Sequence, residues 1–234
     1  MHFNSKIINN ILDNLFPLPE QFGVVVSMDE PSEPININDI RNIVYEIDPD
    51  AFVYFRMSKL VIFSNNIGDV VIKIPFNGYY LEDNDTGELD WTTFQWAAGT
   101  DRSDYCLTEY EKYERLQAYD LECFVAKTIF YKTKCGVRVF LQERVTPESE
   151  LLNSPNASKN SKDLAEKWKD EGKFCIDSQW IATCLDKYGK SKVERFLYYC
   201  SNLDLDILED VHSGNFGYRP NGEPCLIDYS NYED

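Results

Sequence analysis

The stretch that decides the fold reads Asp210-Val-His-Ser-Gly-Asn215, and an apolar run ending in Leu226-Ile-Asp228 follows it. Phosphoryl transfer needs a carboxylate that accepts the proton of an attacking hydroxyl, and oxygen ligands for the magnesium ions that bridge the phosphates. Asp210, Asn215 and Asp228 supply such groups from one loop and one strand end. An Asx-rich turn and an ordinary residue at a strand end are the alternative interpretation.

The wording of this loop resembles the protein-kinase-like superfamily, and it is most similar to aminoglycoside and choline kinase-like phosphotransferases and to kinase-like proteins of bacteriophages or large viruses. The resemblance implies that Asp210 is the catalytic aspartate and that Asn215 and Asp228 bind magnesium. It also implies ATP as phosphate donor and a hydroxyl-bearing acceptor, which is a small molecule or a host protein. His212 is expected either to stiffen the loop or to contact phosphate.

Two charged residues upstream occupy positions that would otherwise be apolar. Lys73 lies inside the run Val70-Val-Ile-Lys-Ile74, and Glu109 falls on the mostly apolar face of a helix predicted over 103–117. Helical spacing places Cys106, Tyr110, Tyr113, Leu116 and Gln117 on that face, and it places Glu111, Lys112, Glu114 and Arg115 on the other. A buried charge is costly unless it is paired. The resemblance implies that Lys73 holds the α- and β-phosphates and that Glu109 positions Lys73. The alternatives are that Lys73 reaches solvent from a strand end and that Glu109 pairs with another base, such as Arg56.

The run Val139–Arg144 resembles the strand that enters the hinge between the lobes of a kinase. The resemblance implies that the backbone of Gln142, Glu143 and Arg144 meets the adenine. The 11 glycines form neither GxGxxG nor GxxxxGK[ST], although close backbone approach to phosphate normally uses glycine. We therefore expect Arg56 or Lys59, next to the first hairpin turn, to contact phosphate instead.

Other features depart from the family pattern. Glu209 adds a like charge beside Asp210, and Tyr229 follows the metal-binding aspartate. Only six residues follow Asp228, where relatives have an activation segment and the helices of a substrate platform. We expect residues 151–201, the N-terminal helix or another chain to support the loop in their place. An inactive pseudokinase that binds nucleotide or a protein partner is the alternative function, and an AMP-transferring relative is disfavoured by Asp210.

The implied fold is α+β and bilobal, with an antiparallel β-sheet N-lobe plus one helix and a truncated, mostly helical C-lobe. Residues 1–40 are predicted as an N-terminal helix and acidic linker, 41–145 as the N-lobe with an insert over 77–101, and 146–234 as the C-lobe. The insert has no clear periodicity, and we expect a turn at 84–87 and anchoring to a core by Trp91, Phe94 and Trp96. The hairpin turn is assigned to residues 56–58, or alternatively to 48–50. The predicted helices cover 5–16 (capped by Ser5), 103–117 (capped by Ser103 or Asp104), 162–171, 176–188 and 191–201. The predicted strands cover 42–47, 51–55, 59–63, 70–74, 124–132, 137–143 and 225–227. Residues 29–39 are predicted as linker, and 147–161 and 202–218 as loops.

Composition limits the class of protein. The 234 residues carry 23 basic and 40 acidic side chains, a net charge of −17 that disfavours non-specific binding to nucleic acid or to an anionic membrane. No apolar run is long enough to span a bilayer, and no signal peptide is apparent. The seven cysteines include no CxxC pair, which favours reduced thiols and a cytoplasmic location, in a host cell if the protein is viral. A protein partner or homo-oligomer is expected to complete the C-lobe.

Overall fold

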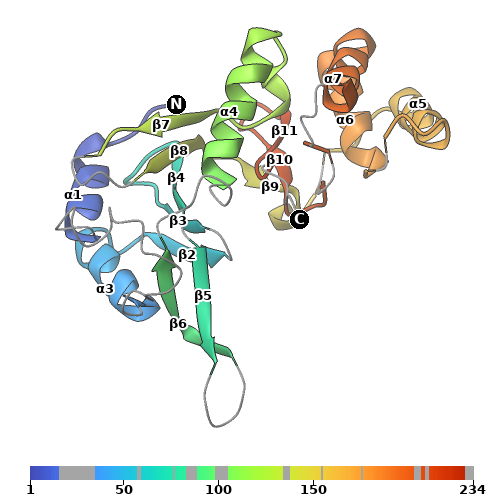
Figure 1. The fold of residues 1–234 in the computed structure, drawn as a ribbon. Helices are drawn as coiled ribbons and strands as arrows, with labels where there is room; N and C mark the ends of the chain where they lie inside the picture. The colour runs from blue at the N-terminus through green and yellow to red at the C-terminus, as the bar shows by residue number, and fades with distance from the viewer. Residues whose placement is uncertain are drawn as a thin grey trace. The chain divides into compact units, whose positions relative to one another are not determined.

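The computed structural model is an α+β protein with antiparallel sheets (Figure 1). It describes residues 1–15, 35–56, 59–75, 77–82, 89–97, 105–133, 138–153, 155–174, 176–202, 207–208 and 211–229. The chain divides into two compact units. The first contains Met1–Leu107 and Thr128–Glu143, and the second contains Thr108–Lys127 and Arg144–Asp234. The stretch Thr108–Lys127, which the sequence analysis places in the N-lobe, therefore groups with the C-terminal residues.

The first unit is built on a five-stranded antiparallel sheet. Its strands are β2 (Phe52–Arg56), β3 (Lys59–Phe63), β4 (Val70–Pro75), β7 (Thr128–Tyr131) and β8 (Val139–Glu143), in the spatial order β2-β3-β4-β8-β7. The strands predicted over 51–55, 59–63 and 70–74 are confirmed to within one residue at each end. The predicted strand 124–132 is shorter than expected, because a 3-10 helix, η1 (Glu122–Phe124), precedes it.

Two helices cover one face of this sheet. Helix α1 (Ser5–Leu15), predicted over 5–16, buries Ile8, Ile11 and Leu12 against alternate residues of the strands, which include Leu60, Ile62, Ile72 and Leu141. Apolar residues at helical spacing on α1 and apolar residues at alternate positions of the strands therefore pack into one core. The cap differs from the prediction: Ser5 is already helical, and the Asn4 side chain accepts a hydrogen bond from the Ile7 amide at 3.3 Å.

The second covering helix corrects the sequence analysis. Residues 42–47, predicted as a strand, belong to α3 (Ile37–Ile47). The β-branched composition favours a strand, but Ile40, Ile43, Val44 and Ile47 recur at helical spacing and pack into the same core as α1. Tertiary packing therefore overrides local propensity. The predicted linker 29–39 is also shorter, since α3 begins at Ile37 and β1 (Ile35–Asn36) precedes it.

Residues 77–101, predicted as an insert without periodicity, contain a hairpin. Strands β5 (Asn77–Glu82) and β6 (Leu89–Ala97) pair antiparallel, and β1 pairs with β6 to make a separate three-stranded sheet. The register shifts between Tyr80 and Leu81. A shift of this kind interrupts the alternation from which a strand is predicted. The expected turn at 84–87 and the side chains of Trp91, Phe94 and Trp96 lie outside the described residues.

Helix α4 (Tyr105–Ala118) agrees with the helix predicted over 103–117. Its buried side includes Cys106, Glu109, Tyr113 and Leu116, as expected. Two assignments are wrong: Lys112, placed on the outer face, is buried, and Gln117, placed on the inner face, is exposed. The expected caps Ser103 and Asp104 lie outside the described residues.

The second unit is mainly helical. Helices α5 (Lys159–Asp170), α6 (Ser178–Tyr188) and α7 (Lys190–Asn202) confirm the three predictions, with α5 beginning three residues early. The predicted loops are partly regular: β9 (Thr146–Pro147), the 3-10 helix η2 (Glu148–Glu150) and the start of α5 lie in one, and β10 (Phe216–Tyr218) lies in the other. Strand β11 (Pro224–Leu226) starts one residue before the predicted strand 225–227. Strands β9, β10 and β11 form a small antiparallel sheet.

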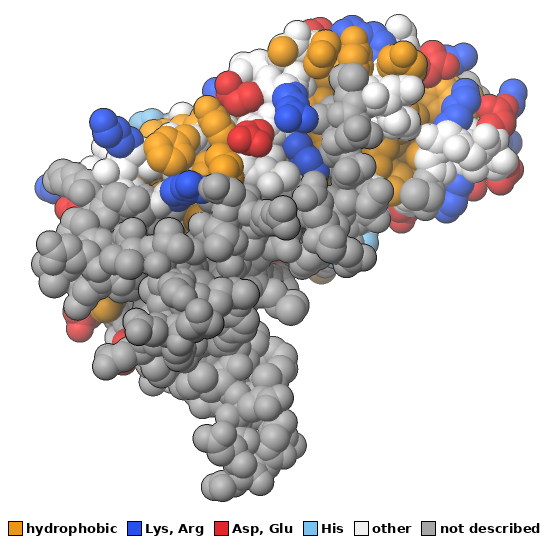
Figure 2. Space-filling view, in the orientation of Figure 1, with side chains coloured by type: hydrophobic (Ala, Val, Ile, Leu, Met, Phe, Trp, Pro, Cys, Tyr) orange, Lys and Arg blue, Asp and Glu red, His pale blue; other side chains and the backbone are white. Residues whose placement is uncertain are grey.

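Helices α5 and α6 begin at residues that cap them, and α6 ends at a glycine. Ser158 caps α5 by accepting a hydrogen bond from the Ser161 amide, Asp177 caps α6, and Gly189 ends α6 at a φ of 81°. Lys167–Glu171 and Lys190–Glu194 are ion pairs one helical turn apart. Basic and acidic side chains alternate over α5 in Figure 2, so the surface of this helix is mixed in charge. Among the described residues, no helix has the length and apolar character needed to cross a membrane.

Candidate functional site

The hairpin β10–β11 carries the motif that the sequence singles out. Phe216 pairs with Leu226 and Tyr218 with Pro224, while Gly222, at a φ of 80°, closes the turn. The Arg219 amide donates to the Glu223 carbonyl at 2.9 Å, and the Gly222 amide donates to the Arg219 carbonyl at 2.8 Å. Because the two strands are antiparallel, the residue before β10 and the residues after β11 lie next to each other at the open end of the hairpin.

Asn215 and Asp228 lie at that open end. The Asn215 carbonyl accepts hydrogen bonds from the amide of Ile227 at 2.8 Å and from the amide of Asp228 at 3.4 Å. Asn215 is buried, with 9% of its surface exposed, and Asp228 is half-buried. Amide and carboxylate oxygens are the ligands that Mg²⁺ prefers, usually one or two per site in addition to phosphate oxygens and water. The two residues therefore have the chemical type of magnesium ligands and are joined through their backbones, and magnesium binding stays a prediction.

The loop before the hairpin is held by its own backbone and by His212. The His212 Nδ1 atom accepts from the Gly214 amide at 3.0 Å, and the His212 carbonyl accepts from the Asn215 amide at 2.8 Å. The Ser213 carbonyl also accepts from the Ser149 amide of η2 at 3.1 Å. Of the two roles expected for His212, the stiffening of the loop has a direct structural basis. Asp210 and its neighbour Glu209 lie outside the described residues.

The hairpin packs on α6 and shares one apolar core with α5 and α7. The Trp180 ring lies 6.4 Å from Phe216 and 6.1 Å from Phe196. Leu226 and Tyr229 belong to the same apolar core. The hairpin that carries the motif residues is therefore packed against large buried aromatic side chains. Close packing of this kind restricts the movement of the hairpin.

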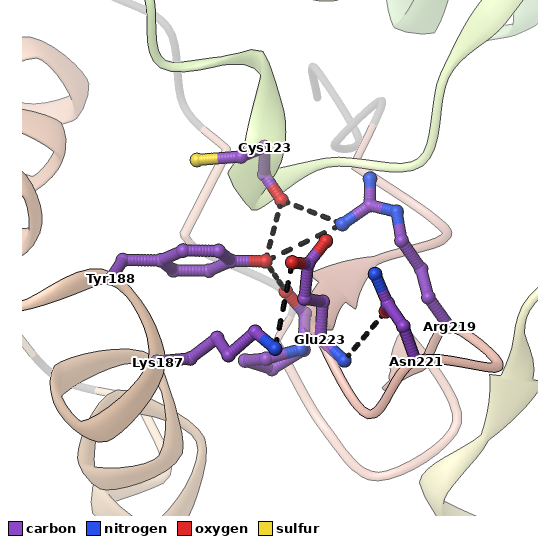
Figure 3. A network of polar contacts seen from close by, with 7 residues as sticks. Cys123, Lys187, Tyr188, Arg219, Asn221 and Glu223 are labelled. Atoms are coloured by element: carbon purple, nitrogen blue, oxygen red, sulfur yellow. Dashed lines mark hydrogen bonds and ion pairs between the residues drawn. The ribbon is translucent and has the colours of Figure 1, made fainter.

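A polar network fastens the other side of the hairpin, as Figure 3 shows. Arg219 donates through Nη1 to the carbonyl of Cys123 and through Nη2 to that of Val125, both at 2.9 Å. The Tyr188 hydroxyl oxygen lies 3.0 Å from the Cys123 carbonyl oxygen and 2.7 Å from that of Pro224. Burial raises the pKa of Tyr188, so this hydroxyl remains a donor at neutral pH.

The sheet of the first unit carries the predicted phosphate-binding lysine. Lys73 has 5% of its surface exposed and lies on β4, opposite Val61 of β3 and Phe140 of β8. Directly opposed residues of antiparallel strands point to one face, and Tyr54 extends this row across β2. Lys73 therefore faces away from α1 and α3. Lys59, two residues from Val61 on the same strand, shares that face and is also 5% exposed.

An aromatic ladder lies on the same face of the sheet. The rings of Phe52, Tyr54 and Phe63 are stacked, with interplanar angles of 7–15° and centroid separations of 5.2–6.5 Å. Phe52 is 52% exposed and Tyr54 is 45% exposed. Large aromatic side chains are normally buried, so an exposed stack of parallel rings is a candidate ligand surface.

The remaining predicted site residues are distributed over both units. Glu109 is fully buried on α4 and belongs to the second unit, whereas Lys73 belongs to the first, so their pairing stays a prediction. Gln142 and Glu143 end β8, and the Gln142 side chain donates to the Thr128 hydroxyl at 3.1 Å. Arg144 is half-buried and begins the next part of the second unit. The Arg56 side chain lies outside the described residues.

Sequence reasoning missed Arg219 and Tyr188, because hydrogen bonds to backbone carbonyls leave no residue pattern. The sequence identifies Tyr229 only as an aromatic side chain, whereas in the structure its hydroxyl donates to the Ala126 carbonyl at 2.9 Å. Within the described part of the chain, no three side chains of His, Cys, Asp or Glu are grouped as a metal site. Comparisons with known proteins find no protein-family model and no characterised protein that matches the chain.

Proposed function

We propose that the protein is a kinase-like phosphotransferase that moves the γ-phosphate of ATP to a hydroxyl acceptor with magnesium. The observation that carries this proposal is the backbone contact of Asn215 with Ile227 and Asp228. It joins two residues that the motif assigns independently to one metal site. Because the two residues assigned as metal ligands are neighbours in the structure, each assignment supports the other. This support is stronger than that of a D-x-x-x-x-N pattern alone.

The topology of the first unit supports the same proposal. In kinases the phosphate-binding lysine lies on the third strand and pairs with a glutamate on the helix that follows. Here Lys73 lies on the third strand of the five-stranded sheet, and α4, which carries Glu109, lies between β4 and β7 in the chain. We therefore propose the bilobal kinase-like arrangement, with the two compact units as its lobes.

The residues have the following roles in this proposal. Lys73 and Lys59 bind phosphate oxygens from the sheet, and the ladder of Phe52, Tyr54 and Phe63 stacks on the base. Glu109 orients Lys73, while Asp210 orients the acceptor hydroxyl and takes its proton. Asn215 and Asp228 hold magnesium, which when bound neutralises charge on the phosphates. Positioning and charge stabilisation supply most of the rate in this chemistry.

Binding is tested by thermal unfolding of the full chain with millimolar ATP and MgCl₂. Because a ligand that binds only the folded protein raises its melting temperature, ATP at 100 times its dissociation constant should stabilise by about 2.7 kcal/mol. Asp228→Asn should remove this shift. Asp163→Asn changes an exposed aspartate of α5 in the same way and should keep it. No shift in the wild-type protein would overturn the proposal.

Catalysis needs its own measurement, because nucleotide binding alone also fits the pseudokinase alternative. Phosphate release or transfer from ATP to a panel of small hydroxyl acceptors and proteins should occur in the wild type and disappear in Asp210→Ala. Nucleotide binding without transfer would favour the binding module. A transfer rate unchanged in Asp210→Ala would contradict the role of this aspartate.

A further inference from the structure

The segment between α4 and β7 forms an additional edge of the β10–β11 hairpin. Val125 and Leu226 form a parallel bridge, and the Ala126 amide donates to the Leu226 carbonyl at 2.7 Å. Val125, Ala126 and Leu226 are fully buried. The position of Leu226, two residues before Asp228, is thus set by residues 123–126.

Side chains of the second unit fix the carbonyls of this segment one by one. Arg219 binds the carbonyl of Val125. Arg219 and Tyr188 both lie against the carbonyl of Cys123, as Figure 3 shows. The next carbonyl, that of Ala126, accepts the hydroxyl of Tyr229 at 2.9 Å. A guanidinium that donates two well-aligned hydrogen bonds restricts orientation as well as distance.

Tyr229 directly follows Asp228 and is 2% exposed. Its ring lies in the core of the second unit, so the ring alone already limits the backbone of residue 228. The hydroxyl adds a directional contact that the ring cannot supply. Asp228 lies between two fixed points: its amide donates to Asn215, and the residue after it donates to Ala126.

We propose that the Tyr229 hydroxyl, acting through the Ala126 carbonyl, is a positioning group that holds Asp228 in register with Asn215. The part of this inference that concerns magnesium rests on the proposed function, whereas the part that concerns the backbone does not. Mg²⁺ requires near-ideal octahedral geometry, so a small displacement of one ligand weakens binding. Removing a group that orients a metal ligand typically lowers metal affinity 10- to 100-fold.

The test compares Tyr229→Phe with Tyr131→Phe in the full chain. Tyr131 donates its hydroxyl to the Asn9 side chain at 3.0 Å in the first unit, so both variants lose one phenolic hydrogen bond. With ATP fixed, the magnesium concentration that gives half of the thermal shift should rise about tenfold in Tyr229→Phe. The same change at Tyr131 should leave this concentration as in the wild type.

Amide hydrogen exchange supplies a readout that needs no ligand. In Tyr229→Phe the amides of Ile227 and Asp228 should exchange faster, because both donate to Asn215 at the hairpin end. Tyr131→Phe should leave them protected. If exchange in the two variants is equal, the inference is overturned, whether or not the wild type binds magnesium with ATP.

The two proposals fail in different ways. A wild type without a magnesium-dependent shift overturns the proposed function, and the exchange comparison still decides whether Tyr229 positions Asp228. A wild-type shift with equal magnesium dependence in both variants overturns the inference for metal binding alone. If Tyr229→Phe does not fold, Arg219→Lys, which keeps the charge but loses the paired geometry, takes its place with the same expected results.

Discussion

At the scale of single residues, the burial of two charged side chains could be predicted from the sequence alone. Lys73 and Glu109 were singled out because a charge interrupts an apolar pattern, and both are buried. Helical spacing places Lys112 on the opposite face of the same helix, and Lys112 is also buried. Helical spacing identifies one buried face, but it does not show how far a second contact surface extends around the helix.

Asp48 illustrates another limit at this scale. Its sequence neighbours Pro49 and Asp50 indicate a turn, and the structure has a turn there. The Asp48 carboxylate is nevertheless 1% exposed, and it accepts hydrogen bonds from the Ser64 hydroxyl and from the Asn66 side chain. These partners are 16 and 18 residues away in the sequence, so no local rule connects them.

The carboxylate of Asp186 provides a pH-dependent prediction. Burial raises the pKa of Asp186, but hydrogen bonds donated by Ser158 and Ser161 outweigh it and hold the pKa below its ordinary value. A lowered pKa means that the ionised form favours folding, so its stabilisation is present above about pH 4 and is lost as the pH falls below that value. We expect Asp186→Asn to cost about 0.5 kcal/mol at pH 7, because the group is mostly exposed and screened.

Urea unfolding of wild type and Asp186→Asn at pH 7 and at pH 3 checks this expectation. The difference in the free energy of unfolding should shrink at the lower pH. Asp163→Asn, on the helix that Ser158 caps, serves as the control and should show no such change. A difference for Asp186→Asn that grows on acidification would contradict the assignment.

At the scale of elements, helices α1 and α4 to α7 and most strands could be predicted because their apolar periodicity is clear. The helix α3 and the hairpin β5–β6 could not. In α3 the β-branched residues point to a strand when read in order, and only the packing against α1 selects the helix. In the hairpin, a register shift within β5 interrupts the alternation.

Strand β10 depends on a glycine for its pairing with β9. A Cβ atom on Gly217 would lie 2.2 Å from the Thr146 carbonyl oxygen, which is backbone and cannot rotate away. We expect Gly217→Ala to separate β9 from β10 and to cost about 3 kcal/mol, the upper end of the range for overpacking. Urea unfolding measures this loss.

Gly172→Ala is the matched control for this prediction. Gly172 has a φ of 71°, and nothing lies within 4 Å of an added Cβ, so only backbone strain of about 1 kcal/mol is expected. An equal loss of stability in the two variants would show that strand contact at Gly217 is not the cause.

At the scale of the whole molecule, charge is unevenly distributed. Residues 159–202, which contain α5 to α7, hold nine basic and seven acidic side chains, whereas the chain as a whole has a net charge of −17. The acidic excess is therefore carried by the rest of the chain. Composition alone predicts the acidic excess of the chain. It does not predict that α5 to α7 lack this excess, because that depends on where the helices begin and end.

Each compact unit has a hydrophobic core of its own. Leu12, which is 1% exposed, belongs to the core of the first unit, and Phe196, which is fully buried, belongs to that of the second. We expect Leu12→Ala to cost about 2–5 kcal/mol and Phe196→Ala about 3–5 kcal/mol. Hydrogen exchange should accelerate mainly in β3 and β4 for Leu12→Ala, and mainly in α6 and α7 for Phe196→Ala.

This regional response is the test of the two cores. If either substitution accelerates exchange equally in both sets of elements, the two cores unfold together. The two units are then one cooperative unfolding unit. A core variant that is too unstable to purify is replaced by Ile11→Val or Phe196→Leu, which remove less volume and should give the same regional pattern at smaller amplitude.

The interleaving of the two units along the chain has a consequence for synthesis. Strand β4 lacks its inner neighbour β8 until residue 139 has left the ribosome, and the amide of Ala126 lacks its acceptor until residue 226 has left it. Leu116, Leu121 and Phe124, all fully buried in the finished protein, lack the part of their core that comes from α6, α7 and the hairpin until those elements follow. Nascent chains halted between residues 130 and 220 should therefore bind a holding chaperone more strongly than the released protein does.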